Sequence, residues 1–133
     1  MVNKVADLAV TTFLAEHISK LRIAVIGDVM LDRYFHGEVK RISPEAPVPV
    51  TKINKIKSVL GGAANVAANL AHLECQVFMG GVTGDDDNRV LLERLMDDAG
   101  IDHSGLVKSS YRKTSTKLRV LGGNQQMLRL DFE

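Results

Sequence analysis

The chain has 133 residues, of which 45% are hydrophobic and 25% charged, and these values are typical of a globular domain with a real core. The formal net charge of +1 gives no general attraction for nucleic acid or an anionic membrane, so neither is expected as a partner. The single cysteine, Cys75, excludes an internal disulfide and predicts a small buried side chain in a reducing compartment. No apolar run approaches the ~20 residues that span a bilayer, and we expect a cytoplasmic protein.

The N-terminal residues predict an amphipathic surface helix, because apolar residues recur there at helical spacing: Val5, Leu8, Ala9, Phe13 and Ile18. The run RIAVIGD that follows, residues 22–28, predicts a buried parallel strand and then a loop of the kind that holds ligands in α/β folds. Asp28 and Asp32 belong to this region and are candidates for binding sugar hydroxyls. A helix cap or a plain loop acid is the alternative for each.

All three prolines of the chain lie in the next segment, at Pro44, Pro47 and Pro49. Proline cannot donate a hydrogen bond to a neighbouring strand, which argues against a central strand. The segment therefore predicts an edge ribbon or flap, with the short strands YFHGEV and VPVTKIN joined by a rigid loop.

The stretch SVLGGAANVAANLAHL, residues 58–73, predicts a helix that opens with Gly61 and Gly62. Glycines at a helix N-terminus let a ligand approach bare backbone, and Asn65 one turn later offers a donor and an acceptor to a hydroxyl. A plain turn, followed by alanines that allow close helix–sheet packing, is the alternative.

The chain then alternates between strand and helix signals. QVFMGGV predicts a buried strand, and residues 84–100 predict a helix that Asp86 or Asp87 caps and Gly100 ends. The buried face of this helix is expected to comprise Leu91, Leu92, Leu95, Met96 and Ala99. SGLVKS predicts one more strand.

The C-terminal residues change to a period of two, with STKLRVL and QQMLRLDF separated by Gly-Gly-Asn, and predict a β-hairpin. One face would be apolar and the other would carry Lys117, Arg119 and Arg129. The basic face is either solvated or suited to a phosphorylated substrate. The chain has no GxGxxG, no P-loop ending and no metal-ligand spacing among its four histidines.

Four strings together, VIGDVMLDRY, RISPEAPVPV, GGAANVAANLAHL and TKLRVLGGNQQMLRLDFE, resemble the ribokinase-like (PfkB) carbohydrate kinases, and within them the branch that acts on heptose 7-phosphate. The resemblance covers nearly the whole chain from Arg22. It implies a three-layer α/β fold with a mainly parallel central sheet and a small β-sheet lid. Residues 1–133 would form the N-terminal portion of one kinase domain, with lid strands at about 34–56 and 115–132.

The resemblance also implies functions for individual residues. The sugar hydroxyls would be held by Asp28, Asp32, Gly61, Gly62 and Asn65. The phosphate group of the sugar would be bound by the lid residues Lys117, Arg119 and Arg129. The complete enzyme would use ATP and Mg²⁺ as cofactors, take a small sugar phosphate as substrate, and form a homodimer through the lid.

Two departures from the family pattern matter. Glu74 stands where the family usually has Gly or Ser. The Gly-Ala-Gly-Asp loop, which carries the family's catalytic base near the ATP site, does not occur in these 133 residues. We therefore expect no catalytic residue and no ATP site in this chain, and no turnover by this segment alone.

Two other functions stay open from the sequence. One is a ribokinase-like kinase for a different sugar or a nucleoside. The other is a non-catalytic module that binds sugar or forms dimers.

Overall fold

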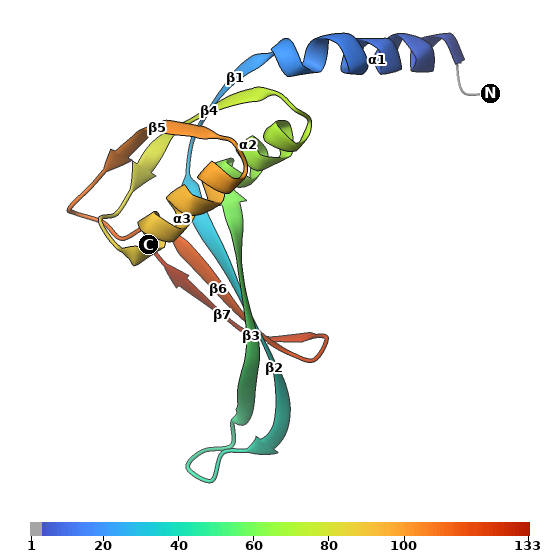
Figure 1. The fold of residues 1–133 in the computed structure, drawn as a ribbon. Helices are drawn as coiled ribbons and strands as arrows, with labels where there is room; N and C mark the ends of the chain where they lie inside the picture. Colours follow the sequence, from blue (N-terminus) through green and yellow to red (C-terminus); the bar gives the residue numbers. More distant parts are fainter. Residues whose placement is uncertain (1–3) are drawn as a thin grey trace.

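The computed structural model describes residues 4–133, with side chains from residue 8 onward apart from residue 15. At its centre lies a parallel sheet of three strands in the order β1–β4–β5 (Figure 1). The strands are β1 (Arg22–Ile26), β4 (Gln76–Thr83) and β5 (Asp102–Lys108). Parallel neighbours need crossover connections, and two helices supply them. The α/β class predicted from the sequence is confirmed.

Helices α2 (Ala63–His72) and α3 (Asp87–Asp98) pack on one face of this sheet. Alternate strand residues, such as Val77 and Met79 of β4, point into that interface because side chains of a strand alternate between its two faces. Cys75 is buried beside them as a free thiol, as predicted. The core lies in this layer.

Helix α3 has the boundaries and the buried face that the sequence predicts. The Asp86 side chain caps it by accepting a hydrogen bond of 3.0 Å from the Arg89 backbone N–H. Gly100 follows the helix with a φ of 69°, a conformation that glycine adopts without strain. Its buried face consists of Leu92 and Met96, flanked by the partly buried Leu91, Leu95 and Ala99.

A second sheet of four strands has the order β3–β2–β6–β7. Its members are β2 (Val29–Ile42), β3 (Pro49–Gly62), β6 (Thr116–Gly122) and β7 (Gln125–Phe132). β2 runs antiparallel to β3 and parallel to β6. The outer ends of β2 and β3 project away from the parallel sheet (Figure 1). We call this second sheet the lid.

The prediction of an edge ribbon with two short strands is wrong for β2. β2 is an interior strand with neighbours on both sides, and it spans 14 residues. It contains no proline, since Pro44 and Pro47 lie in the connecting turn and Pro49 opens the edge strand β3. The prolines mark the turn and the edge, where no backbone N–H is needed for pairing.

The helix predicted to open with Gly61 and Gly62 begins directly after them, and the residues before it form a strand. Residues 58–62 continue β3 and pair with residues 29–33 of β2, and the helix begins only at Ala63. A Cβ on Gly61 would lie 2.6 Å from Oδ2 of Asp32, and Gly62 turns the chain with a φ of 56°. The two glycines therefore serve a close approach and a sharp strand-to-helix turn.

The hairpin of β6 and β7 has the two faces that the sequence predicts. Pairing aligns Lys117 with Asp131 and Arg119 with Arg129, so these side chains share one face. With the aligned residues of β2 they form the lid polar face: Asp32, Tyr34, Lys117, Arg119, Arg129 and Asp131. The opposite, lid apolar face consists of Phe35, Ile56, Leu118, Val120, Leu128, Leu130 and Phe132.

At the N-terminus, α1 (Lys4–His17) and the short 3-10 helix η1 (Ile18–Lys20) confirm the predicted helix. Ile18 packs against the core, whereas Leu8 and Phe13 are exposed and α1 extends away from the sheets (Figure 1). Val5, also assigned to the apolar face, lies outside the residues whose side chains are described. Within residues 4–133 no helix is long and apolar enough to cross a bilayer.

Candidate functional site

The predicted sugar-binding residues gather where the parallel sheet meets the lid. β1 ends at Ile26 and β2 starts at Val29, which places Asp28 in the link between the two sheets. The Ala63 backbone N–H donates a hydrogen bond of 2.8 Å to the Asp28 carbonyl oxygen. This bond ties the first residue of α2 to the link, so Asp28 and the glycine turn are held together.

Asp32 lies on the lid polar face, three residues beyond the start of the pairing between β2 and β3. Its carboxylate fills the space that a side chain on Gly61 would need. Arg119 of β6 forms an ion pair with it, and both side chains are about four-fifths buried, with exposed fractions of 21% for Arg119 and 18% for Asp32. The hydrogen bond to Asp32 raises the pKa of Arg119. Asp32 is therefore a carboxylate with a fixed position and a fixed counter-ion.

Tyr34 completes this arrangement, although the sequence analysis did not single it out. Tyr34 and Arg119 are aligned across the parallel pair of β2 and β6. The Arg119 guanidinium lies over the Tyr34 ring, 5.2 Å from its centroid. Side chains two positions apart in a strand lie on the same face, so Tyr34 shares the face of Asp32. This spacing in the sequence could have identified Tyr34 as a residue of the site.

The other two predicted lid cations are also paired with carboxylates. Lys117 Nζ lies 3.3 Å from Asp131 Oδ2 and 3.6 Å from Glu133 Oε1, and Arg129 Nε lies 3.1 Å from Asp131 Oδ1. Partial burial of Asp131 opposes its ionisation, but the Lys117 hydrogen bond and the Arg129 charge outweigh this effect and lower its pKa. The lid polar face thus carries alternating charges.

A cavity of about 140 Å³ lies between the link and the lid. Two of the predicted residues, Asp28 and Lys117, line it together with Met30 and with residues of the segment before β6. Asn65 does not line this cavity and is exposed on the first turn of α2. The structure therefore brings Asp28 and Lys117 to one cavity and Asp32 to Arg119, whereas Asn65 lies outside that cavity, at the start of α2.

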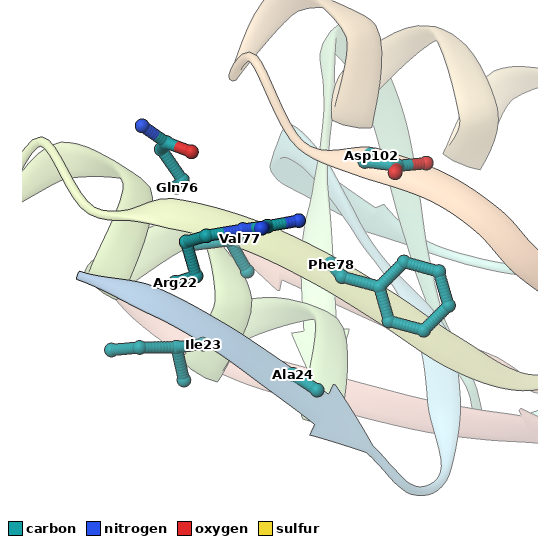
Figure 2. A pocket seen from close by; sticks show the side chains of 7 residues that line it. All are labelled: Arg22, Ile23, Ala24, Gln76, Val77, Phe78 and Asp102. Atoms are coloured by element: carbon teal, nitrogen blue, oxygen red, sulfur yellow. The ribbon is translucent and has the colours of Figure 1, made fainter. Parts of the chain in front are cut away.

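A larger cavity, of about 460 Å³, lies elsewhere, at the amino end of the parallel sheet (Figure 2). None of the predicted site residues lines it. The lining side chains come from β1, β4 and β5: Arg22, Ile23, Ala24, Gln76, Val77, Phe78 and Asp102. It belongs to the sheet face that α2 and α3 do not cover, where Ile26 and Val107 are strongly exposed. Since the predicted sugar-binding residues lie at the opposite end of the parallel sheet, where β1 leads into β2, we do not assign the sugar to it.

The segment from Ser109 to Ser115 joins β5 to β6 and is fixed by buried polar contacts that the sequence analysis missed. The Thr114 N–H donates a bond of 2.9 Å to Asp86, and the Gly84 N–H donates one of 3.0 Å to the buried Thr114 hydroxyl. Burial raises the pKa of Asp86, but the bonds from Thr114 and Arg89 outweigh it and give a net lowering. Asp86 therefore both caps α3 and anchors this segment.

Magnesium needs several oxygen ligands gathered at one place. Within residues 4–133 no three side chains of His, Cys, Asp or Glu gather into a group that could hold a metal ion. Of the two acids of the candidate site, Asp32 is already paired with Arg119. We therefore assign Mg²⁺ no ligand among these residues.

Known proteins align in sequence with most of this chain. The model of the pfkB family carbohydrate kinases matches residues 20–131. The chain is 51% identical over 119 residues to the D-beta-D-heptose 7-phosphate kinase of Bordetella bronchiseptica, covering 90% of this chain and 38% of that protein. It is 54% identical over 114 residues to the bifunctional protein HldE of Shewanella denitrificans, covering 86% of this chain and 24% of that protein.

Solved structures show the same fold at low sequence identity. A carbohydrate kinase from Agrobacterium tumefaciens superposes with a TM-score of 0.68 at 21% identity, over 84% of this chain and 35% of that one. The nucleoside kinase of Methanocaldococcus jannaschii, an archaeal member of the ribokinase family, gives a TM-score of 0.62 at 22% identity, over 84% and 36%. The chain thus spans well under half the length of the relatives it matches. With a ribokinase-like fold and a family match over most of its length, this chain belongs to the pfkB family of carbohydrate kinases.

Proposed function

We propose that this chain is the sugar-binding and lid portion of an ATP-dependent kinase that phosphorylates O1 of D-glycero-D-manno-heptose 7-phosphate. The reaction would be a cytoplasmic step in the synthesis of ADP-heptose, a precursor of the lipopolysaccharide core. Identity of 51% and 54% to a heptose 7-phosphate kinase and to HldE supports this substrate over other sugars. The solved structures support the fold alone.

The observation that carries the proposal is the convergence of Asp28, Asp32 and the Gly61–Gly62 turn where the parallel sheet meets the lid. Carboxylates beside bare backbone suit a polyol, because each carboxylate oxygen accepts bonds from hydroxyl groups and glycine admits close contact. Asp28 would orient hydroxyls in the 140 Å³ cavity. Asp32, beside Arg119, would accept a hydrogen bond from a further hydroxyl. Asn65 would form a hydrogen bond with the sugar from the start of α2.

Phosphoryl transfer depends mainly on positioning and on stabilisation of charge, and little on a protein nucleophile. The residues of this chain would supply the positioning: the link and the glycine turn hold the sugar, and the lid excludes water from it. ATP with Mg²⁺ would supply the phosphoryl group and neutralise its charge. The catalytic base would come from the Gly-Ala-Gly-Asp loop of the family, which does not occur in this sequence.

The lid apolar face supports a homodimer as the assembly. Its members include Ile56, Leu128 and Phe132, with exposed fractions of 53%, 50% and 48%. Arg33 lies among these residues with its guanidinium 5.3 Å from the Phe35 ring centroid, and its buried Nε has no hydrogen-bond partner within residues 4–133. A second lid packed on this face would cover the apolar side chains and could offer an acceptor to Arg33.

The test is calorimetric titration of the 133-residue chain with D-glycero-D-manno-heptose 7-phosphate, compared with fructose and adenosine. We expect binding of the heptose phosphate and no ATP turnover. Asp28→Ala should abolish binding, whereas Asp98→Ala, which removes an exposed carboxylate from α3, should leave it unchanged.

Three results would contradict the proposal. Preferential binding of fructose or adenosine would favour another ribokinase-like kinase. Dimer formation without any sugar binding would favour a non-catalytic dimerisation module. Turnover of ATP with heptose 7-phosphate by this chain alone would show that it contains a base that we have not assigned.

A further inference from the structure

The three lid cations that the family resemblance assigns to the sugar phosphate are already neutralised inside the lid. Arg119 pairs with Asp32, and both Lys117 and Arg129 pair with Asp131. A phosphate that bound there would share each cation with a carboxylate of like charge, and the repulsion between the two anions would weaken its binding. The substrate phosphate therefore needs cations that are free.

Two such cations lie on the segment between β5 and β6. Within residues 4–133, neither Arg112 nor Lys113 lies within ion-pair distance of a carboxylate, and both side chains are exposed. The charge of Lys113 acts on Asp86 from a distance. The Asp86 carboxylate itself already accepts hydrogen bonds from the backbone N–H groups of Arg89 and Thr114. Arg112 donates one bond of 2.8 Å to the Ser115 hydroxyl, and its other donors remain available.

Arg112 stands between two neighbouring cavities. It lines the 140 Å³ cavity that contains Asp28, and it also lines a second cavity of about 260 Å³. The second cavity is lined further by Ser109, Ser110 and Lys113, and by the acids Asp85 and Glu133. Asp85 is paired with Lys108 at 2.7 Å and Glu133 with Lys117 at 3.6 Å, which offsets their charges.

The segment is held in place before any ligand binds. Its C-terminal end is anchored by the contacts of Thr114 with Asp86 and Gly84, and at its other end the Ser109 N–H donates 2.9 Å to the Thr83 carbonyl. A fixed segment loses little conformational freedom on binding, so its cations and hydroxyls act as a preorganised group.

We infer that Arg112 and Lys113, with the hydroxyls of Ser109 and Ser110, form the subsite for the phosphate monoester of the sugar substrate. Arginine can bind two oxygens of a phosphate at once, and serine hydroxyls donate to the remaining oxygens. The inference rests on the proposed function, which places the sugar in the adjoining cavity beside Asp28. It assigns the phosphate to this segment and leaves the lid cations with their carboxylates.

The experiment compares heptose, heptose 7-phosphate and inorganic phosphate on the 133-residue chain, by calorimetry and by backbone amide shifts in NMR spectra. We expect heptose 7-phosphate to bind about tenfold or more tightly than heptose, which is the ratio expected from a charge-assisted contact. Arg112→Ala and Lys113→Ala should each reduce that ratio and leave heptose affinity unchanged. Arg94→Ala, which removes an exposed arginine from α3, should leave the ratio intact.

The possible outcomes separate this inference from the proposed function. An unchanged ratio in both Arg112→Ala and Lys113→Ala would overturn the inference even if the sugar binds. If heptose does not bind, but inorganic phosphate shifts the amides of residues 109–113 and Arg112→Ala abolishes those shifts, the phosphate subsite stands and the proposed function fails. Absence of any shift overturns both. Displacement of inorganic phosphate by a non-hydrolysable ATP analogue, but not by heptose 7-phosphate, would assign the subsite to the nucleotide and overturn it for the sugar.

Discussion

Asp32 on β2 and Arg119 on β6 form an ion pair between residues that are 87 positions apart in the chain. The pair joins the two halves of the lid, because β2 and β6 are the strands through which the two hairpins of that sheet meet. It also fixes a carboxylate beside the bare backbone of Gly61. One contact thus serves both the assembly of the lid and the orientation of a candidate sugar ligand.

Arg119→Ala should destabilise the fold by roughly 1–2 kcal/mol, because it leaves a largely buried carboxylate without its partner. Urea unfolding measures this change. Arg129→Ala is the matched control: the Arg129 side chain is 54% exposed, so its loss should cost less than about 0.5 kcal/mol. Equal effects of the two substitutions would contradict the importance of the pair between Asp32 and Arg119.

Gly61→Ala should destabilise the chain by about 1–3 kcal/mol and weaken sugar binding, because the new methyl group would lie 2.6 Å from the Asp32 carboxylate. Thermal unfolding and calorimetric titration measure the two effects. Gly80→Ala is the control within β4, since its nearest contact would be an ordinary 3.4 Å from Ile26. A Gly61→Ala chain that binds heptose 7-phosphate as the unmodified chain does would show that Asp32 is not held for the sugar.

Asp86→Ala should cost about 2 kcal/mol of stability at neutral pH, because α3 loses its cap and the Thr114 N–H loses its acceptor. The folded-state pKa of Asp86 lies below its ordinary value of 3.8. The stabilisation is therefore complete above about pH 4 and is lost as the pH falls through the lower folded-state value. Unfolding measured from pH 2 to pH 7 should show a smaller acid-dependent loss in Asp86→Ala than in Asp87→Ala, which keeps the cap. Parallel pH profiles for the two variants would refute this role.

Ile56→Lys should weaken self-association, because it places a charge on the lid apolar face. Sedimentation equilibrium measures the change as a shift from dimer to monomer at a given concentration. Val90→Lys introduces the same charge at an equally exposed position on α3, where 58% of the side chain is accessible, and should leave association unchanged. A greater loss of dimer with Val90→Lys would place the contact on the helical layer.

The sequence predicted the regular parts of the fold because local signals agreed with tertiary structure there. The cap at Asp86, the stop at Gly100 and the two-faced hairpin of β6 and β7 are each determined within a few residues. These elements needed no knowledge of distant contacts.

The lid and the glycine turn could not be predicted in detail, because distant partners determine them. β2 is an interior strand only because it pairs with β6, and Gly61 lies in a strand because it pairs with Met30 of β2. The ion pair of Arg119 with Asp32 likewise cannot be predicted from the local sequence, because the two residues are 87 positions apart. The segment containing Arg112 carries no periodic signal, and its position depends on the buried contacts of Thr114.

The parallel pairing of β2 with β6 has a consequence for the order in which the chain folds. β2 and β3 form a hairpin with nearby partners, but β2 gains its second neighbour only after residues 116–122 have been synthesised. Contacts between such distant segments form slowly, because a long loop must close before they stabilise the structure. During synthesis on the ribosome, the hairpin of β2 and β3 would therefore carry an unpaired edge on β2, and this edge could pair with another chain.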